Sequence, residues 1–275
     1  MSDFTIRFWG VRGSLPCPGA ATRRYGGNTP CVEVRCGKRL LILDAGTGLR
    51  ELGDALVAEG SAIDADLLLT HCHYDHVIGI PFFAPFYDPQ HRFRIWAGNL
   101  LPDFRLEPVM QNMMSEPLFP IGIDMFKAKI DYRDFRAGET IANNGEVTIR
   151  TVPLNHPGGA TGYRIDFGGR SFSYITDDEW RRDAHDKHLI AIARDTDLLI
   201  YDTAYTEGEI EAKKGWGHST WRDGVRFADA AGARTLCLFH HAPEHDDDAM
   251  DALLAEARVA RPGTIAAIEG QTIRL

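Results

Sequence analysis

The chain has 275 residues, of which 44% are hydrophobic and 25% are charged, and its formal net charge is −9. This is ordinary globular usage, and with no linker or repeat in the sequence we expect one α/β domain covering residues 1–275. The acidic balance argues against a broad nucleic-acid surface, which needs Lys and Arg to neutralise phosphates, but it allows a small anionic substrate at a site with bound cations.

The chain begins without the basic region and long apolar run of a signal peptide, and no apolar run reaches the length of a membrane span. The five cysteines are an odd number without a framework spacing, which favours free thiols in a reducing compartment. We therefore expect a cytoplasmic protein with no membrane association.

Strand patterns open the chain at residues 5–9, 31–35 and 40–43. Asp44 closes the third of these, and residues 49–58 then have helical periodicity. A carboxylate at the end of a strand commonly orients neighbouring ligands through hydrogen bonds. We therefore expect Asp44 to brace a site rather than to bind a metal.

The next strand pattern, residues 65–70, leads into a cluster of His71, His73, Asp75 and His76. Because alternate residues of an extended segment point the same way, His71 and His73 can bind one cation. Asp75 and His76 lie past the bend and can bind a second. Imidazole with carboxylate suits zinc, or iron or manganese where more oxygen is present. Surface or helix-capping histidines are the alternative, but they would rarely cluster in this way.

Residues 100–126 are rich in methionine and phenylalanine and are interrupted by prolines. This pattern fits a flexible apolar lid or a dimer contact, because methionine-rich surfaces adapt to a partner. It fits equally well a helix that packs on the core. The sequence leaves the three interpretations open.

The second half of the chain continues with strand and helix patterns. Strands are predicted over residues 147–154, 162–167, 171–175, 197–201, 235–239 and 264–268, and helices over residues 219–231 and 246–260.

Along the whole chain, strand-like runs repeatedly end in a residue of a metal-binding type. In chain order these residues are Asp44, His71, His156, Asp177, Asp202 and His240. Ligand sites of open α/β sheets lie at the carboxyl ends of strands, so we expect one shared sheet edge to bring these side chains together.

The chain resembles the metallo-β-lactamase superfamily. The resemblance is carried by residues 43–48, the cluster from His71 to His76, and residues 154–156, 176–177 and 238–240, in the family's order over most of the chain. It implies an α/β fold in the form of a four-layer αββα sandwich, with a two-metal site on one edge.

The family pattern also implies a set of ligands. His71, His73 and His156 would hold the first metal, and Asp75, His76 and His240 the second, with Asp177 bridging both and Asp44 bracing the site. Asp178 is the weaker candidate for the bridge, because the family's aspartate follows its strand immediately. Two divalent ions are implied; we expect zinc, with manganese and iron also compatible.

Residues 217–220, Gly-His-Ser-Thr before a predicted helix, resemble the His-Ser-Thr motif of ribonuclease Z and its phosphodiesterase relatives. The resemblance implies that His218 is a catalytic acid and that Asp202 orients it. A helix-capping or solvent-exposed histidine is the alternative. Residues 152–156 and 161–163 are similar to bacterial phosphoribosyl cyclic-phosphate phosphodiesterases.

Two departures from these relatives affect the expected substrate. Ribonuclease Z carries a tRNA-gripping arm, typically between the residues that correspond to His156 and Asp177, and a hairpin fills that short stretch here. We therefore do not expect tRNA as a substrate. The cyclic-phosphate enzyme carries a cysteine-rich zinc site near its N-terminus, which has no counterpart in this sequence.

The expected activity is hydrolysis of a small or cyclic phosphodiester by a hydroxide shared between the two metals. His218, Asp202 and Asp75 are the expected catalytic residues, and Arg12 is an expected substrate contact, because an Arg can fork onto phosphate oxygens. The alternatives are a lactonase or thioesterase of the same fold, which would lack the His-Ser-Thr motif, and a non-catalytic metal-binding module. Analogy with related enzymes suggests a homodimer.

Overall fold

The computed structural model describes residues 4–143, 145–181 and 187–275, and it contains two seven-stranded sheets. The first sheet consists, in spatial order, of β14 (Thr272–Arg274), β1 (Phe4–Gly10), β2 (Cys31–Cys36), β3 (Arg39–Leu43), β4 (Asp64–Leu69), β5 (Arg92–Ala97) and β6 (Lys129–Asp134). The second consists of β13 (Ile265–Ala266), β12 (Thr235–Phe239), β11 (Leu198–Asp202), β10 (Arg170–Ile175), β9 (Ala160–Phe167), β8 (Val147–Leu154) and β7 (Thr140–Asn143).

Helices cover the outer faces of both sheets. The α-helices are α1 (Gly48–Ala58), α2 (Tyr74–Val77), α3 (Leu106–Met113), α4 (Lys187–Ala193), α5 (Trp221–Ala231) and α6 (Asp247–Ala260). Short 3-10 helices lie at η1 (Ala20–Thr22), η2 (Ile80–Phe82), η3 (Ala84–Tyr87), η4 (Ile123–Met125) and η5 (Ile210–Lys213). Within the described residues, each helix is too short or too polar to serve as a membrane span.

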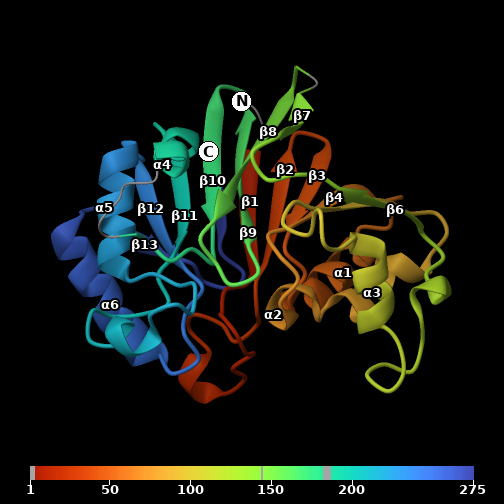
Figure 1. Cartoon of the computed structure of the whole chain (residues 1–275), viewed down its shortest axis with the longest axis horizontal. Coiled ribbons are helices and arrows are strands. Elements are labelled where there is room, and N and C mark those ends of the chain that lie inside the picture. Colours follow the sequence, from red (N-terminus) through yellow and green to blue (C-terminus); the bar gives the residue numbers. More distant parts are fainter. Residues whose placement is uncertain (1–3, 144, 182–186) are drawn as a thin grey trace.

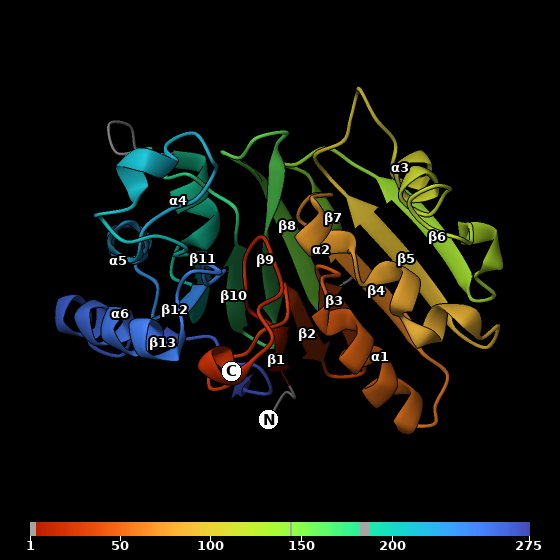
Figure 2. The same cartoon turned by 90° about the horizontal axis from the view of Figure 1, so that it is seen from below.

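The layers follow from the burial pattern of the strands. Apolar side chains of both sheets form a core between them, in which the rings of Phe8 and Phe239 lie 6.0 Å apart. A second core packs α1 and α3 onto the first sheet, and a third packs α4, α5 and α6 onto the second. Figure 1 shows these helices on opposite sides of the paired sheets, and Figure 2 shows the same layers from below. The predicted four-layer αββα sandwich is confirmed.

The polar residues that follow the strands do meet at one edge of the molecule, but two sheets supply them rather than one. β3 and β4 run parallel in the first sheet, and β10, β11 and β12 run parallel in the second. Their carboxyl ends therefore lie at the same edge of each sheet. Asp44, Asp177 and His240 each have a positive φ, of 59°, 61° and 63°. Asp44 and His240 directly follow β3 and β12, and Asp177 follows β10 after one residue. Non-glycine residues rarely adopt this conformation, and it occurs here where each chain turns into the site.

Residues 100–126 pack on the first sheet. Leu106, Met110 and Met114 are fully or almost fully buried in the core beside α1, as the core-packing interpretation requires. Phe104 and Leu118 in the same segment are exposed. A homodimer contact stays a prediction.

Candidate metal centre

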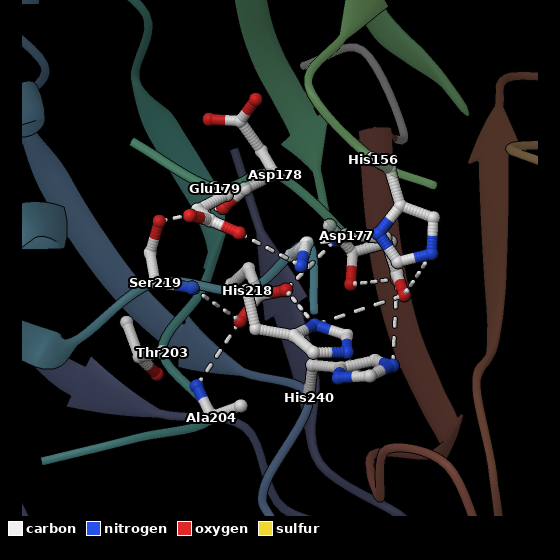
Figure 3. A network of polar contacts seen from close by, with 12 residues as sticks. His156, Asp177, Asp178, Glu179, Thr203, Ala204, His218, Ser219 and His240 are labelled. Atoms are coloured by element: carbon white, nitrogen blue, oxygen red, sulfur yellow. Dashed lines mark hydrogen bonds and ion pairs between the residues drawn. The ribbon is translucent and has the colours of Figure 1, made fainter. Parts of the chain in front are cut away.

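Asp177 lies between His156 and His240 (Figure 3), and its two carboxylate oxygens face different histidines. Oδ1 lies 3.9 Å from His71 Nε2 and 3.7 Å from His156 Nε2. Oδ2 lies 3.2 Å from His76 Nε2 and 3.4 Å from His240 Nε2. The carboxylate therefore separates the imidazoles into two groups and touches both.

The remaining predicted ligands complete these two groups. His73 Nδ1 lies 3.1 Å from His156 Nε2, on the side of Asp177 Oδ1. Asp75 Oδ2 lies 3.3 Å from His76 Nε2 and 3.4 Å from His240 Nε2, on the other side. The backbone N–H of Ser14 donates to the same Asp75 oxygen at 2.7 Å and fixes that carboxylate.

The donor set fits metal ions. Nε2 of His71, His76 and His240 are buried, and none has a hydrogen-bond partner within the described part of the chain. Buried polar atoms almost always have a hydrogen-bond partner. Three buried nitrogens that lack one and converge on one carboxylate are therefore suited to bind a metal ion. Ligand atoms of His71, His73 and His156 lie within 4.8 Å of one another, as do those of Asp75, His76 and His240.

At Asp177 and at His71, His73 and His156, the electrostatics favour the protonation states that metal binding needs. At His76 burial lowers the pKa, but the carboxylates of Asp75, Asp177 and Asp44 outweigh it and raise the pKa above its usual range. Burial, together with the neighbouring histidines, lowers the pKa of His71, and burial also lowers the pKa of His73 and His156. Burial opposes a charge on Asp177, but His240 and the other histidines outweigh it and hold the pKa of this carboxyl well below its usual range. Neutral imidazoles and an ionised carboxylate are the forms that coordinate divalent metals.

Asp44 braces the cluster from behind, in the position expected for it. Its carboxylate is fully buried, accepts hydrogen bonds from the Thr70 N–H at 2.8 Å and the Tyr174 hydroxyl at 2.9 Å, and lies 2.9 Å from His76 Nδ1. Tyr174 is not predictable from the sequence, because it lies 130 residues from Asp44 and no local pattern marks it. Thr70 could have been found from its place directly before the cluster.

His218 and Asp202 form a tightly held pair beside Asp177. His218 Nδ1 lies 2.7 Å from Asp202 Oδ2, an oxygen that also accepts the N–H of Asp177 at 2.9 Å. Burial lowers the pKa of His218, but the charge and hydrogen bond of Asp202 outweigh it and raise the pKa to about 9. The His218 ring also stacks on that of His240, with the ring centroids 4.8 Å apart. His218 is therefore held in one orientation beside the proposed ligands.

The local sequence explains how His218 is presented. Thr220 caps α5 in a capping box with Asp223, so the helix-cap interpretation of His218 is wrong. Ser219 Oγ donates to the backbone carbonyl of Asp178 and anchors the turn. Gly217 has a φ of 87°, and a methyl group there would overlap the ring of His156.

Asp178 and Glu179 support the loops around the site. Asp178 accepts hydrogen bonds from the Asn155 N–H at 3.0 Å and the Tyr201 hydroxyl at 2.9 Å. Its carboxylate points away from His218 and His240 (Figure 3). Glu179 Oε2 accepts the backbone N–H groups of Gly215 and Gly217. No sequence pattern marks Glu179, since only the folded chain brings it to this loop.

The expectation that Arg12 contacts the substrate is wrong. Arg12 is fully buried, and its guanidinium donates to the backbone carbonyls of Gly26, Ala242 and His245. These bonds tie the N-terminal loop to the segment after β12. From sequence, a charged residue in a glycine-rich loop is expected to be exposed to solvent. Here carbonyls of distant segments accept its hydrogen bonds, which allows Arg12 to be buried.

A pocket of about 350 Å³ opens onto the cluster. Its lining includes His73, Asp75, His156, Asp177 and His218. A molecule that enters this pocket therefore contacts proposed metal ligands of both groups and His218.

Known proteins share this architecture. The family model described as the beta-lactamase superfamily domain matches residues 39–241, well over half of the chain. A ribonuclease Z of Haloarcula marismortui is 26% identical, over 96% of this chain and 94% of its own. The metallo-beta-lactamase fold protein YhfI of Bacillus subtilis superposes with a TM-score of 0.76 at 20% identity and covers 100% of both chains. A diphosphatase from the PhnP family superposes with a TM-score of 0.71 at 20% identity, over 99% of this chain and 98% of its own.

These comparisons overturn the exclusion of tRNA, because a relative matched over nearly its whole length is named ribonuclease Z. The exclusion rested on the short stretch between His156 and Asp177, which β9 and β10 do fill. A gripping arm supplies binding contacts away from the metal ligands, so its absence at one position does not decide which phosphodiester reaches them. The match of the family model, together with the sandwich and the His/Asp cluster, shows that this chain belongs to the beta-lactamase superfamily and is a hydrolase with its metallo-β-lactamase fold.

Proposed function

We propose that this hydrolase is a phosphodiesterase with a dinuclear metal centre. The observation that carries the proposal is the position of Asp177, whose two oxygens face two separate groups of histidines beside the His218–Asp202 pair. His71, His73 and His156 would hold one ion, and Asp75, His76 and His240 the other, with Asp177 shared. This nitrogen-rich set favours zinc, with manganese or iron as alternatives.

Two divalent ions bound in such a site stabilise the charge on phosphoryl oxygens and lower the pKa of a coordinated water. The residues of this chain supply the remaining functions. Asp202 accepts a hydrogen bond from His218 Nδ1–H, which leaves Nε2 as the nitrogen that serves the substrate. A protonated His218 gives its proton to the leaving oxygen, which an alkoxide needs near neutral pH. Ser14 holds Asp75 in position through its backbone N–H.

The presence of His218 also favours a phosphodiesterase over a lactonase or thioesterase. A phosphodiester with a poor leaving group needs protonation of that group, and the buried Asp202 next to His218 sustains a proton there. The names of the relatives agree with phosphate ester chemistry. Small or cyclic phosphodiesters and tRNA 3′ ends all present the same bond, so each belongs in the substrate test.

The test is a substrate panel run on zinc-loaded and chelator-treated protein. It contains linear and cyclic phosphodiesters, a tRNA precursor, a lactone and a thioester. We expect hydrolysis of phosphodiesters that disappears on chelation and returns with metal, and elemental analysis close to two ions per chain. Hydrolysis of only the lactone or thioester, or full activity in protein without metal, would refute the proposal.

A further inference from the structure

Two exposed aromatic side chains stand at the mouth of the site. Trp216 is 55% exposed and Tyr74 is 67% exposed, and both line the pocket that contains Asp177 and His218. Single exposed aromatic residues are common on protein surfaces. Two on the rim of one pocket, next to a buried polar cluster, indicate a surface for a ligand that carries a planar ring.

The backbone on both sides of Trp216 is fixed rather than free. Gly215 and Gly217 have φ values of 84° and 87°, and their N–H groups donate to the same oxygen of Glu179 at 2.8 Å and 3.0 Å. The Gly217 carbonyl lies 2.9 Å from His156 Nδ1, so the loop is also attached to a proposed metal ligand. Trp216 is therefore presented to solvent on a backbone that is anchored to the site.

The ammonium group of Lys213 lies over the ring of Trp216. Lys213 Nζ lies 4.3 Å from the centroid of the indole and 5.6 Å from that of Tyr205. A cation on one face of an indole leaves the other face for a planar ring.

We infer that Trp216 and Tyr74 are specificity-determining residues that stack on a nucleobase joined to the scissile phosphodiester. This inference rests on the proposed phosphodiesterase function and narrows its substrate class to nucleotide phosphodiesters. Every base has an aromatic face, so stacking selects for the presence of a base and tolerates its identity. Phosphodiesters without a base bind only through the metal site and lose this contribution.

The kinetic test uses two substrates that differ only in the base: the dinucleotide adenylyl-adenosine and its analogue with abasic riboses. Stacking on a protein aromatic corresponds to roughly 5- to 140-fold in affinity. In Trp216→Ala we expect KM for the dinucleotide to rise by at least about fivefold, with kcat retained and KM for the abasic analogue unchanged. Trp216→Phe should restore most of the affinity because it keeps a ring, and Tyr74→Ala should shift KM in the same direction.

The matched control is Phe104→Ala. Phe104 is 62% exposed and does not line the pocket, so its loss should leave both KM values unchanged. A second readout is independent of turnover: titration of zinc-loaded protein with adenosine 5′-monophosphate should quench tryptophan fluorescence. That quenching should disappear in Trp216→Ala, although the other four of the five tryptophans are retained.

Each outcome separates the inference from the proposed function. Hydrolysis of phosphodiesters with equal KM changes on both substrates would overturn the inference and leave the function standing. A change in the oligomeric state of Trp216→Ala, without a change in KM, would also overturn it. Quenching by the nucleotide in a protein that hydrolyses no phosphodiester would support base stacking and refute the function.

Discussion

Replacement of Asp44 tests how the fold prepares a ligand for its metal. The carboxylate of Asp44 accepts from Thr70 and Tyr174 and lies 2.9 Å from His76 Nδ1. Because an ionised carboxylate can only accept, this contact holds the ring proton of His76 on Nδ1. Nε2 then keeps its lone pair and faces Asp177, at 3.2 Å.

In Asp44→Asn the side chain keeps its size and tolerates the φ of 59°. Its NH2 group donates where the carboxylate accepted, so the proton of His76 moves to Nε2 and blocks that nitrogen. We expect the affinity for Zn2+ to fall about 10- to 100-fold, the usual effect of losing a carboxylate behind a metal-binding histidine. This corresponds to about 1.4 to 2.8 kcal/mol of binding free energy.

The assay is a competition titration with a chromophoric chelator, with the metal content of each variant measured beside it. Asp66→Asn is the matched control, because Asp66 is equally buried and accepts from Arg39, Arg94 and Trp96, none of which belongs to the ligand cluster. This control should lose stability but keep its zinc affinity. An Asp44→Asn protein that binds zinc as tightly as the wild type would refute the reasoning.

Three further predictions, tested with four substitutions, concern residues around the site. Gly217→Ala should lose metal and activity, since the new methyl group overlaps the ring of His156. The control is Gly215→Ala, which has a similar φ but open space around the new methyl group, and it should lower the free energy of unfolding by only about 1–2 kcal/mol in a denaturation curve. Equal losses of metal in the two variants would contradict this prediction. Arg12→Met should lower the free energy of unfolding by about 3 kcal/mol or more, because three buried carbonyls lose their donor; a raised KM at normal stability would instead revive a substrate role. Burial raises the pKa of Glu269 from its ordinary 4.5 to about 7, so the stability linked to its proton is present below the lower value and is lost as pH rises through the upper one. Glu269→Gln should therefore have a higher Tm than the wild type at about pH 8 and the same Tm at about pH 4, and a constant difference at both would be inconsistent with this linkage.

The sequence alone was sufficient for the features that depend on neighbouring residues. The alternation of His71 and His73 after an apolar run places both imidazoles on one side of an extended chain, whatever the rest of the protein does. The same holds for most strands, whose runs of apolar residues set their length. β5, β6, β7 and β14, by contrast, were not predicted, although β5 and β6 alternate charged and apolar residues as half-exposed strands do.

Only the tertiary structure decided which distant groups meet. Three features depend on segments far apart in the chain: the division of the ligands by Asp177, the bond from Tyr174 to Asp44, and the burial of Arg12. The longest separation is 233 residues, for the bond from Arg12 to the His245 carbonyl. A polar side chain is buried only where the fold supplies its partners, and a linear pattern does not contain those partners. The sequence therefore predicted which His and Asp residues gather at one site, and the packing of the two sheets determined how they are oriented and supported.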